Sequence, residues 1–420
     1  MKERVVLHAD CNSFFASVEC KKRPELKEVP MAVAGDPESR HGIILAKNEK
    51  AKKFGVKTAE TIWQARQKCP ELVLVPPCYE DYTACSKQVN AIYQQYTDLC
   101  EPFGIDETFL DVTGSMHLFD KDGEGIAQEL RERVKKEVGI TISVGVSFNK
   151  VFAKLGSDYK KPDAVTVISR QNFREIVYPL AAGDMLNVGP KAEARLNAFG
   201  IYTIGQLAAA RKDFLQSLFG KAGESMWRAA NGLDDDPVHS IAEESIAKSV
   251  GQGVTFPRNL MGAHEISLGI SMLAEKVAER LRNRELVCTG VQISIRDPQF
   301  KNISRQKALR EPSCLYAEIY ALAWELAQAN WNMNQPVRAI SVTALGIGRK
   351  GEIPVQSSLF ADEKEHTRAE QLEQAVFTLR KKYGRQSIGR AGVMSADFSH
   401  GKGNNRNDKG SYIPFHGIEE

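Results

Sequence analysis

The sequence predicts an α+β protein built from several domains, and three observations support this fold class. The chain has 420 residues, more than one compact hydrophobic core usually holds. Strand-like and helix-like segments alternate through about the first 170 residues. The pattern then turns helical to about residue 232, and an acidic segment at 232–237 precedes a second α+β pattern.

The first region places acidic residues at strand ends. A strand is expected over 4–10, ending at Asp10, and the polar residues after it predict a capped helix through Glu19. Further short strands and helices are expected at 31–35, 42–47, 48–54, 61–69, 72–75 and 82–99. Asp106 and Glu107 then begin a strand to 112, followed by a helix at 125–138 and a strand at 141–146. This alternation predicts one mixed α/β domain.

Three carboxylates would converge if the strands that carry Asp10 and the Asp106-Glu107 pair are neighbours in one sheet. Such a cluster repels itself unless cations lie within it, and Mg²⁺ prefers carboxylate oxygens together with substrate phosphates. Two ions about 4 Å apart would stabilise the entering and leaving oxygens of a phosphoryl displacement. Taken alone, an Asp-Glu pair before an apolar strand is common and favours a solvated loop, and only the surrounding sequence favours a metal site.

The helical region contains a turn with the features of a phosphate contact. The segment Leu186-Asn187-Val188-Gly189-Pro190-Lys191 resembles a helix-hairpin-helix element, which commonly binds DNA phosphates. Gly189 would let backbone N–H groups face a phosphate oxygen, and Lys191 would add charge. The alternative is a glycine-proline turn that only connects two helices.

The region from about 244 is expected to be a separate domain. Helices are expected at 264–283 and 315–329, and strands at 287–295 and 339–345. Basic residues on or beside strands could follow a phosphate backbone: Arg296, Lys301, Arg305, Lys307 and Arg310. The alternative is a charged strand edge in solvent. A last helix carries Leu372, Val376, Leu379 and Tyr383 on one face, which would contact either a partner or the protein's own body.

Composition excludes several classes of protein. No apolar run approaches the roughly 20 residues of a membrane helix, and the N-terminus lacks the pattern of a secretory signal, so a cytoplasmic location is expected. The net charge of +3 says little about nucleic acid. The eight cysteines show no C-x-x-C pair, which argues against structural zinc and a disulfide framework. A P-loop is excluded because Leu215 stands where that motif needs glycine.

Two motifs carry a resemblance to a known family. His8-Ala9-Asp10-Cys11-Asn12-Ser13-Phe14-Phe15-Ala16-Ser17-Val18-Glu19 resembles the opening of the Y-family DNA polymerases, and Gly104-Ile105-Asp106-Glu107-Thr108-Phe109-Leu110-Asp111-Val112-Thr113 resembles their second catalytic motif. The similarity continues through Ser143 to Lys150, Lys154 to Pro162 and the hairpin element, over roughly 350 residues.

The resemblance implies a right-hand polymerase with a mixed α/β palm, small fingers, a helical thumb and an α+β little finger. The palm would comprise 1–19 and 77–169, the fingers 20–76 and the thumb 170–232. A linker at 233–243, a little finger at 244–350 and a tail at 351–420 would follow. The implied activity is error-prone translesion synthesis from dNTPs on a primed DNA template, by a monomer without membrane attachment.

The resemblance also assigns roles to residues. Asp10 and Asp106 would bind two Mg²⁺ ions, with Glu107 and the Cys11 carbonyl completing their ligands. Phe15 would be the steric gate against ribonucleotides, beside Phe14, while Lys161 and Lys52 would contact the triphosphate. The predicted DNA contacts are Lys150, Gly189 and Lys191, together with four residues from the basic strand pattern described above, Arg296, Lys301, Arg305 and Lys307.

The sequence departs from the common family pattern at Asn12, Glu49 and Lys52, which replace an aspartate, a tyrosine and an arginine. Asn12 and Lys52 are similar to the branch that contains the catalytic subunit of bacterial DNA polymerase V. Glu49 is a doubtful phosphate contact, because an unpaired carboxylate would repel the nucleotide.

A short peptide beyond the catalytic body, Gln356-Ser357-Ser358-Leu359-Phe360, resembles the bacterial sliding-clamp-binding motif. Leu359 and Phe360 would fill an apolar pocket of the β clamp, while Gln356 fixes the register. Two other functions would use some of the same features. A metal-dependent nuclease needs the carboxylates and the hairpin, but no steric gate, and a DNA-bound scaffold needs no intact carboxylates.

Overall fold

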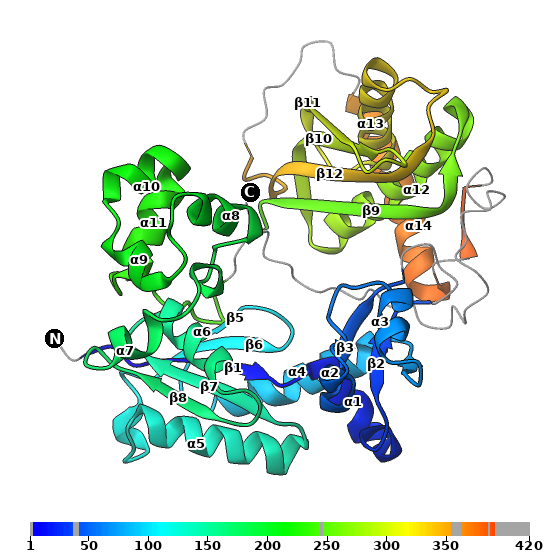
Figure 1. Ribbon diagram of the computed structural model, residues 1–420. Helices are drawn as coiled ribbons and strands as arrows, with labels where there is room; N and C mark the ends of the chain where they lie inside the picture. Colours follow the sequence, from blue (N-terminus) through cyan, green and yellow to red (C-terminus); the bar gives the residue numbers. More distant parts are fainter. Residues whose placement is uncertain (1–2, 37–41, 244–246, 354–362, 385–386, 391–420) are drawn as a thin grey trace. The chain divides into compact units, whose positions relative to one another are not determined.

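The structure is a computed structural model that describes residues 3–36, 42–243, 247–353, 363–384 and 387–390 (Figure 1). The predicted clamp-binding residues Gln356, Leu359 and Phe360 lie outside these ranges. The chain folds into two compact units that divide near residue 244. The predicted palm, fingers and thumb lie in the first unit, and the predicted little finger lies in the second.

A five-stranded sheet in the order β5-β6-β1-β7-β8 forms the predicted palm. Its strands are β1 (Val6–Cys11), β5 (Cys100–Pro102), β6 (Glu107–Asp111), β7 (Ile142–Ser147) and β8 (Val165–Ile168). The central strand β1 pairs antiparallel with β6 and β7, and β8 pairs parallel with β7. This pairing makes the strands that carry Asp10 and Glu107 direct neighbours.

Helices cover both faces of this sheet. On one face, side chains such as Leu7 pack with residues of α1 (Phe14–Lys22), α4 (Tyr79–Tyr93) and α5 (Gly123–Arg133). On the other face lies α6 (Lys150–Tyr159). The sequence places the helix before β5 at 82–99, but α4 ends at Tyr93, and turns at 94–99 lead into the short strand β5.

Glycine at position 145 sets how closely α6 approaches the sheet. A Cβ atom at Gly145 would lie 1.9 Å from the backbone oxygen of Ala153, and one at Gly156 would lie 3.0 Å from Gly145 Cα. The absence of side chains at both positions lets the helix pack directly on β7. The polar side of α6, which includes Lys154 and Ser157, therefore reaches residues of β1.

The predicted fingers contain a small sheet in the order β3-β2-β4. Its elements are β2 (Met31–Ala34), β3 (Ile44–Lys47), α2 (Glu49–Lys53), α3 (Ile62–Lys68) and β4 (Val73–Val75). Asn48 caps α2 by accepting a hydrogen bond from the backbone N–H of Ala51, and Thr61 and Gln64 form a capping box at α3.

The predicted thumb is entirely helical. It contains α7 (Phe173–Val177), α8 (Pro190–Ala198), α9 (Ile204–Ala209), α10 (Lys212–Phe219) and α11 (Lys221–Ala230). Its core is continuous with Phe148 and Phe152, which belong to the start of α6 and the turn before it. The thumb therefore packs onto the palm through α6.

The predicted linker at 233–243 lies along the palm. Val238 is buried against Val6 and Phe109, and Arg4 donates hydrogen bonds to the carbonyl oxygens of Asp235 and Asp236. These contacts hold the segment in place.

The second unit contains a four-stranded antiparallel sheet in the order β11-β10-β12-β9. Its elements are β9 (Ser249–Leu260), α12 (Gly262–Asn283), β10 (Leu286–Arg296), β11 (Asn302–Ser313), α13 (Tyr316–Asn330) and β12 (Val337–Arg349). The apolar face of the sheet packs on α12 and α13. The opposite face carries a shallow groove of about 220 Å³, lined by residues such as Thr255, Ser294, Arg296 and Ser341.

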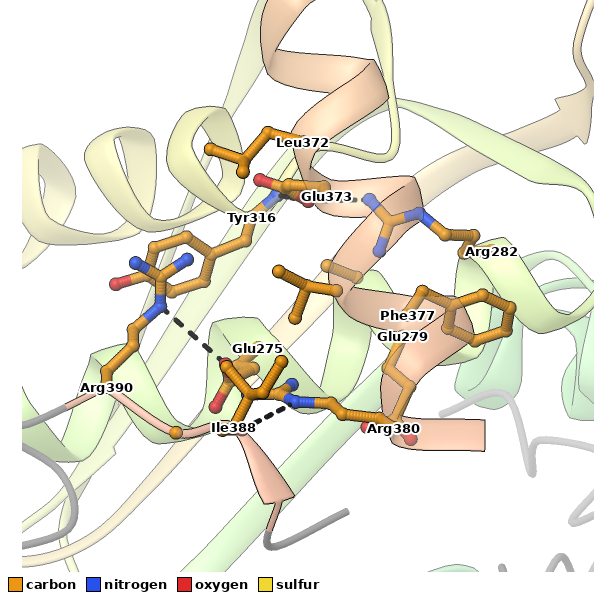
Figure 2. Close-up of a pocket in the computed structure, with 13 residues that line it drawn as sticks. Glu275, Glu279, Arg282, Tyr316, Leu372, Glu373, Phe377, Arg380, Ile388 and Arg390 are labelled. Carbon is orange, nitrogen blue, oxygen red and sulfur yellow. Dashed lines mark hydrogen bonds and ion pairs between the residues drawn. The ribbon is translucent and has the colours of Figure 1, made fainter. Parts of the chain in front are cut away.

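The C-terminal helix α14 (Glu363–Tyr383) packs on α12 and the start of α13 (Figure 2). Arg282 forms an ion pair with Glu373 at 2.6 Å, and Arg380 forms one with Glu275 at 2.8 Å. The helix thus contacts the protein's own body, through a face that includes Val376 and Phe377 and has Leu372 at its margin, whereas Leu379 and Tyr383 remain exposed. These contacts support internal packing, and the exposed part of the stripe is available to a partner.

Candidate active site

Strand register brings the predicted catalytic carboxylates together. Asp10 lies directly opposite Glu107 in the antiparallel pair of β1 and β6, and Asp106 immediately precedes β6. The backbone N–H of Cys11 donates to the carbonyl oxygen of Asp106 at 3.0 Å. Because the Cys11 thiol is buried, this residue can offer the site only backbone atoms.

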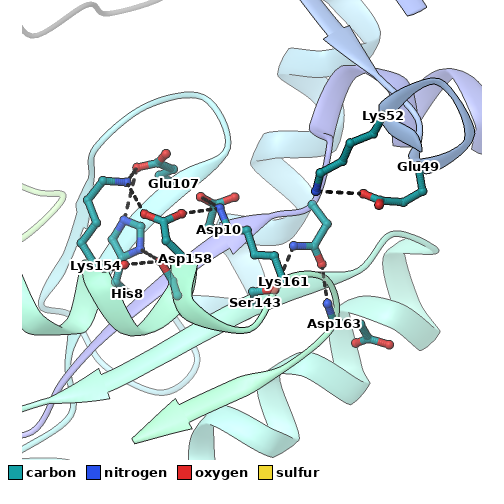
Figure 3. Close-up of polar contacts among 12 residues, drawn as sticks. His8, Asp10, Glu49, Lys52, Glu107, Ser143, Lys154, Asp158, Lys161 and Asp163 are labelled. Atoms are coloured by element: carbon teal, nitrogen blue, oxygen red, sulfur yellow. Dashed lines mark hydrogen bonds and ion pairs between the residues drawn. The ribbon is translucent and has the colours of Figure 1, made fainter. Parts of the chain in front are cut away.

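Two lysines pair with these carboxylates (Figure 3). Lys161 Nζ lies 2.6 Å from Asp10 Oδ2 and 2.7 Å from Asp158 Oδ1. Lys154 Nζ lies 2.6 Å from Glu107 Oε2. In this arrangement ammonium groups balance part of the negative charge at the strand ends.

The pKa values of the three carboxylates differ, because burial and neighbouring charges act on each of them to a different extent. Burial raises the pKa of Asp10 to about 7 despite the opposing charge of Lys161. Burial and the charge of Glu107 raise the pKa of Asp106 to about 6. Burial acts in the same direction on Glu107, but hydrogen bonding to His8 and the charge of Lys154 outweigh it and lower its pKa to about 2. The cluster therefore favours added positive charge near Asp10 and Asp106.

His8 is a fully buried side chain behind Glu107. Its Nδ1 lies 2.8 Å from Ser157 Oγ, and that hydroxyl donates to the carbonyl oxygen of Lys154, so it accepts from His8. His8 Nε2 lies 3.3 Å from Glu107 Oε2. Burial lowers the pKa of His8, while Glu107 opposes this shift, because only a protonated ring can donate to Ser157 and Glu107 at the same time.

The donor set fits a hard divalent cation, although the side chains are not arranged around one. Within the described ranges, no three carboxylate, imidazole or thiolate groups lie close enough to hold a metal ion as they stand. The lysines explain this, because Asp10 and Glu107 point toward Lys161 and Lys154 (Figure 3). Carboxylate oxygens are the ligands that Mg²⁺ prefers, and burial, together with the charge of Glu107, raises the pKa values of Asp10 and Asp106, so a bound cation would stabilise their ionised forms.

The predicted steric gate is an aromatic ring held by other aromatic rings. Phe15 stacks on Tyr82 with ring centroids 4.3 Å apart and meets Tyr79 edge-on at 6.0 Å. The Tyr82 hydroxyl donates to buried Glu19 at 2.7 Å, which fixes the supporting ring. Phe14 is only 3% exposed and belongs to the palm core. Its assignment to the nucleotide site is therefore corrected, because its ring is covered by protein.

In the fingers, the two residues that depart from the family pattern face each other. Lys52 Nζ lies 3.7 Å from Glu49 Oε1, and both side chains are about half exposed. Burial, assisted by the charge of Lys52, lowers the pKa of nearby Lys47. Glu49 is thus an ion-pair partner of Lys52 in this structure.

The residues predicted to contact DNA differ in their surroundings. Gly189 precedes α8 as its N-cap, and Lys191 is exposed in the first turn of that helix. Arg296 donates to Asn302, and both line the groove on the open face of the second sheet. Lys301 is exposed at the turn between β10 and β11.

Three other cations have partners inside the protein. Lys150 forms an ion pair with Glu101 at 2.8 Å and is only 13% exposed. Arg305 donates to Asn330 and Lys307 pairs with Glu325, and both partners lie on α13. These contacts fit the alternative of a charged strand edge for Arg305 and Lys307.

Sequence reasoning assigned no role to His8, Lys154, Asp158 or Tyr82. A signal existed on α6, because Lys150, Lys154 and Asp158 recur at intervals of four residues and so share one helix face. Nothing in the sequence indicates that this face meets β1. The structure also has all eight cysteines as free thiols, and the described part of the chain has no helix with the length and hydropathy of a membrane span.

A sheet with carboxylates at the ends of neighbouring strands, next to lysines and an aromatic ring, is the architecture of a nucleotidyl-transferring polymerase palm. Two family models match the chain, the impB/mucB/samB family at 9–158 and its C-terminal domain at 247–359. The chain belongs to the Y family of DNA polymerases.

Individual proteins support this membership. DNA polymerase IV of Acetivibrio thermocellus is 44% identical over 395 residues, covering 94% of this chain and 98% of the relative. DNA polymerase IV 1 of Bacillus subtilis is 34% identical over 406 residues, covering 97% of each chain. A solved Y-family DNA polymerase chimera superposes with a TM-score of 0.71 at 24% identity, covering 84% of this chain and all of the other, and supports the fold.

Proposed function

We propose that the protein extends a primer 3′-hydroxyl with deoxynucleotides by two-metal nucleotidyl transfer. Membership of the Y family implies DNA template binding and a divalent metal ion, and the proposal adds two Mg²⁺ ions and dNTPs. The observation that carries it is the pairing of β1 with β6, which places buried Asp10 beside the partly buried Asp106 and Glu107.

Each acidic residue has a distinct part in this proposal. Asp10 and Asp106, whose pKa values burial raises to about 7 and about 6, would hold both ions. Glu107 and the Cys11 carbonyl would complete the ligands on the primer side and the nucleotide side. When bound, the ions would supply Lewis-acid stabilisation of the entering 3′-oxygen and the leaving pyrophosphate.

The lysines would change partners when the nucleotide arrives. Lys161 pairs with Asp10 and Asp158 in the structure described here. A cation at Asp10 would take over the balance of that carboxylate, so the ammonium of Lys161 becomes free to contact a phosphate. Lys52 would contribute a second charge from the fingers, after loosening its 3.7 Å contact with Glu49.

Sugar selection would depend on Phe15. Its ring is half-buried, and Tyr82 and Tyr79 restrict its movement from two sides. A ring in a fixed position beneath the incoming sugar would exclude a 2′-hydroxyl by van der Waals contact.

The two units would each contribute to DNA binding. In the first unit, the exposed turn at Gly189 and Lys191 would contact phosphates through backbone N–H groups and one charge. In the second unit, Arg296 and Lys301 would contact phosphates from the open sheet face and its adjoining turn.

We further propose recruitment by the sliding clamp through Gln356, Leu359 and Phe360. The peptide has the clamp-binding pattern and lies between β12 and α14 in sequence. Error-prone translesion synthesis, a monomeric state and a cytoplasmic location complete the proposal.

Primer extension tests the central claim. Wild-type protein, a primed template, dNTPs and Mg²⁺ should give longer primers with release of pyrophosphate, and Asp106→Ala should reduce the rate by about 10³-fold or more. Glu124→Ala is a matched control, since it also removes a carboxylate but is exposed in the first turn of α5, away from the carboxylates and lysines of the site. A shortened primer would indicate a nuclease, and an unchanged primer would indicate a non-catalytic DNA-binding protein.

A further inference from the structure

Asn12 connects three segments of the palm. It lies directly after β1 and is only 7% exposed. Its side-chain oxygen accepts a hydrogen bond from the backbone N–H of Asp163 at 2.9 Å, and its side-chain nitrogen donates to Ser143 Oγ at 2.9 Å. Figure 3 shows both contacts meeting between Ser143 and Asp163.

The orientation of this amide follows from the chemistry of its partners. A backbone N–H can only donate, so the oxygen of Asn12 must face Asp163, and the nitrogen then faces Ser143. The backbone of Asn12 is also fixed, since its N–H donates to Thr141 and its carbonyl accepts from Ser17 Oγ. Asn12 is therefore a rigid support for the segment of chain that contains Asp163.

Asp163 belongs to the loop between α6 and β8, and Lys161 lies two residues before it. Asp163 has a φ of +55°, a left-handed conformation that a residue other than glycine adopts at some energetic cost. Its carboxylate is held by Lys135 at 2.8 Å and Arg131 at 3.5 Å. The bond from Asn12 ties this end of the loop to the end of β1, and the next residue is held to β7 by the bond from the Val144 N–H to the Ala164 carbonyl oxygen.

The other end of the loop contacts the candidate active site through Lys161. Lys161 Nζ lies 2.6 Å from Asp10 Oδ2, and Asp10 is itself two residues before Asn12. The distance between the ammonium of Lys161 and the carboxylate cluster thus depends on a short path through Lys161, Asp163 and Asn12. Loosening one bond in this path would let the loop, and the ammonium with it, move away from β1.

We propose that Asn12 is a positioning residue for the nucleotide, which acts by holding the Lys161 loop at the end of β1. The inference rests on the proposed contact between Lys161 and the triphosphate. Asn12 itself touches no substrate in this account. Its loss lowers the affinity for dNTP, because Lys161 must then be ordered at the moment of binding.

A purely structural role for Asn12 predicts a different result. Loss of a buried hydrogen bond destabilises the palm and reduces activity whether or not Lys161 is present. An effect transmitted through Lys161 disappears once the ammonium is removed. A double-mutant cycle separates the two cases.

Single-nucleotide insertion on a primed template, with Mg²⁺ and varied dNTP, provides the test. The variants are Asn12→Leu, Lys161→Met and the double variant, with thermal unfolding measured for each. Asn12→Leu should raise KM for dNTP about 10-fold with little change in kcat, and it should add less than about 2-fold in the Lys161→Met background. Equal effects of Asn12→Leu in both backgrounds, or an unchanged KM, would overturn the inference.

Conservative variants complete the design. Asn12→Asp keeps the acceptor for the Asp163 N–H, and the Ser143 hydroxyl can rotate to donate, so KM should stay within about 3-fold of wild type. Ser143→Ala removes only the second partner of the Asn12 amide, and it supplies the test if Asn12→Leu does not fold. A rise in KM for dNTP in Ser143→Ala, smaller than the 10-fold expected for Asn12→Leu and absent in the Lys161→Met background, supports the inference. An unchanged KM in Ser143→Ala overturns it. Unchanged KM in Lys161→Met alone would instead refute the proposed triphosphate contact.

Discussion

Replacing Asp10 with asparagine should stabilise the protein in the absence of metal while abolishing its catalytic activity. Folding raises the pKa of Asp10 from 3.8 to about 7, mainly through burial. A carboxylate with a raised pKa favours the fold while it is protonated, and that contribution is lost as the pH rises from about 4 to about 7. At pH 8 the ionised side chain therefore opposes folding, and an uncharged amide of nearly the same shape does not.

The size of the effect follows from the pKa values. At about 1.4 kcal/mol per pKa unit, a rise from 3.8 to about 7 corresponds to an upper bound of about 4 kcal/mol at pH 8. The substitution also removes the 2.6 Å ion pair with Lys161, which keeps its contact with Asp158. A net gain of about 2 kcal/mol is expected, or about 4–8 °C in Tm. At pH 5 most of the gain should disappear.

Differential scanning calorimetry in EDTA at pH 5 and pH 8 would measure this, and the chain supplies two controls. Glu107→Gln should lower the Tm of the first unit, the opposite of the effect of Asp10→Asn, because a pKa of about 2 means that ionised Glu107 stabilises the fold. The transition of the second unit should not move, since Asp10 lies in the first unit. Adding Mg²⁺ at pH 8 should stabilise wild type more than Asp10→Asn. A lower Tm for Asp10→Asn at pH 8, or an equal shift at both pH values, would refute the reasoning.

Three further predictions concern other parts of the chain. Phe15→Ala should raise rNTP relative to dNTP incorporation by about 10-fold or more, because the ring that blocks the 2′-hydroxyl is gone; unchanged discrimination in single-nucleotide insertion would exclude this gate. Alanine at Leu359 and Phe360 should weaken clamp binding about 10-fold or more in surface plasmon resonance, with primer extension in the absence of the clamp unaffected; equal affinity would contradict the motif. Arg282→Met should cost α14 about 1–3 kcal/mol by leaving Glu373 without its 2.6 Å partner, and unaltered hydrogen exchange in the helix would argue against docking through this pair.

Much of the first unit could be predicted because its sequence patterns are local. Asp10 and Asp106 follow and precede apolar runs of strand length, and the register of β1 with β6 makes these strands neighbours. The strand β9 (Ser249–Leu260) was not identified, since its two glycines and Pro257 interrupt the alternation and suit the edge of a sheet. The three residues of β5 give no periodicity to detect.

Contacts between distant segments account for most of what the sequence did not indicate. The sequence shows Leu372, Val376, Leu379 and Tyr383 as an apolar face, but α14 turns Val376 toward the body and leaves Leu379 and Tyr383 exposed. Its ion pairs, such as Arg282 with Glu373, have no periodic signature. In the same way, Lys154 reaches Glu107 only because α6 packs tightly against Gly145. A pattern shows which residues share a face, and tertiary packing decides what that face meets.

The lysines of the candidate site connect the stability of the palm with its proposed chemistry. Without Lys154 and Lys161, the fold would bury Asp10, Asp106 and Glu107 with no cation beside them, at a cost that their pKa values already indicate in part. A divalent ion and a triphosphate bring opposite charges to the site together. The ion would replace the ammonium groups at the carboxylates, and the phosphates would accept the ammonium that is released, so Asp10 and Lys161 would each keep a partner of opposite charge. Binding of metal and nucleotide should therefore be mutually dependent in wild type, and this dependence should weaken in Lys161→Met because the group that exchanges partners is missing.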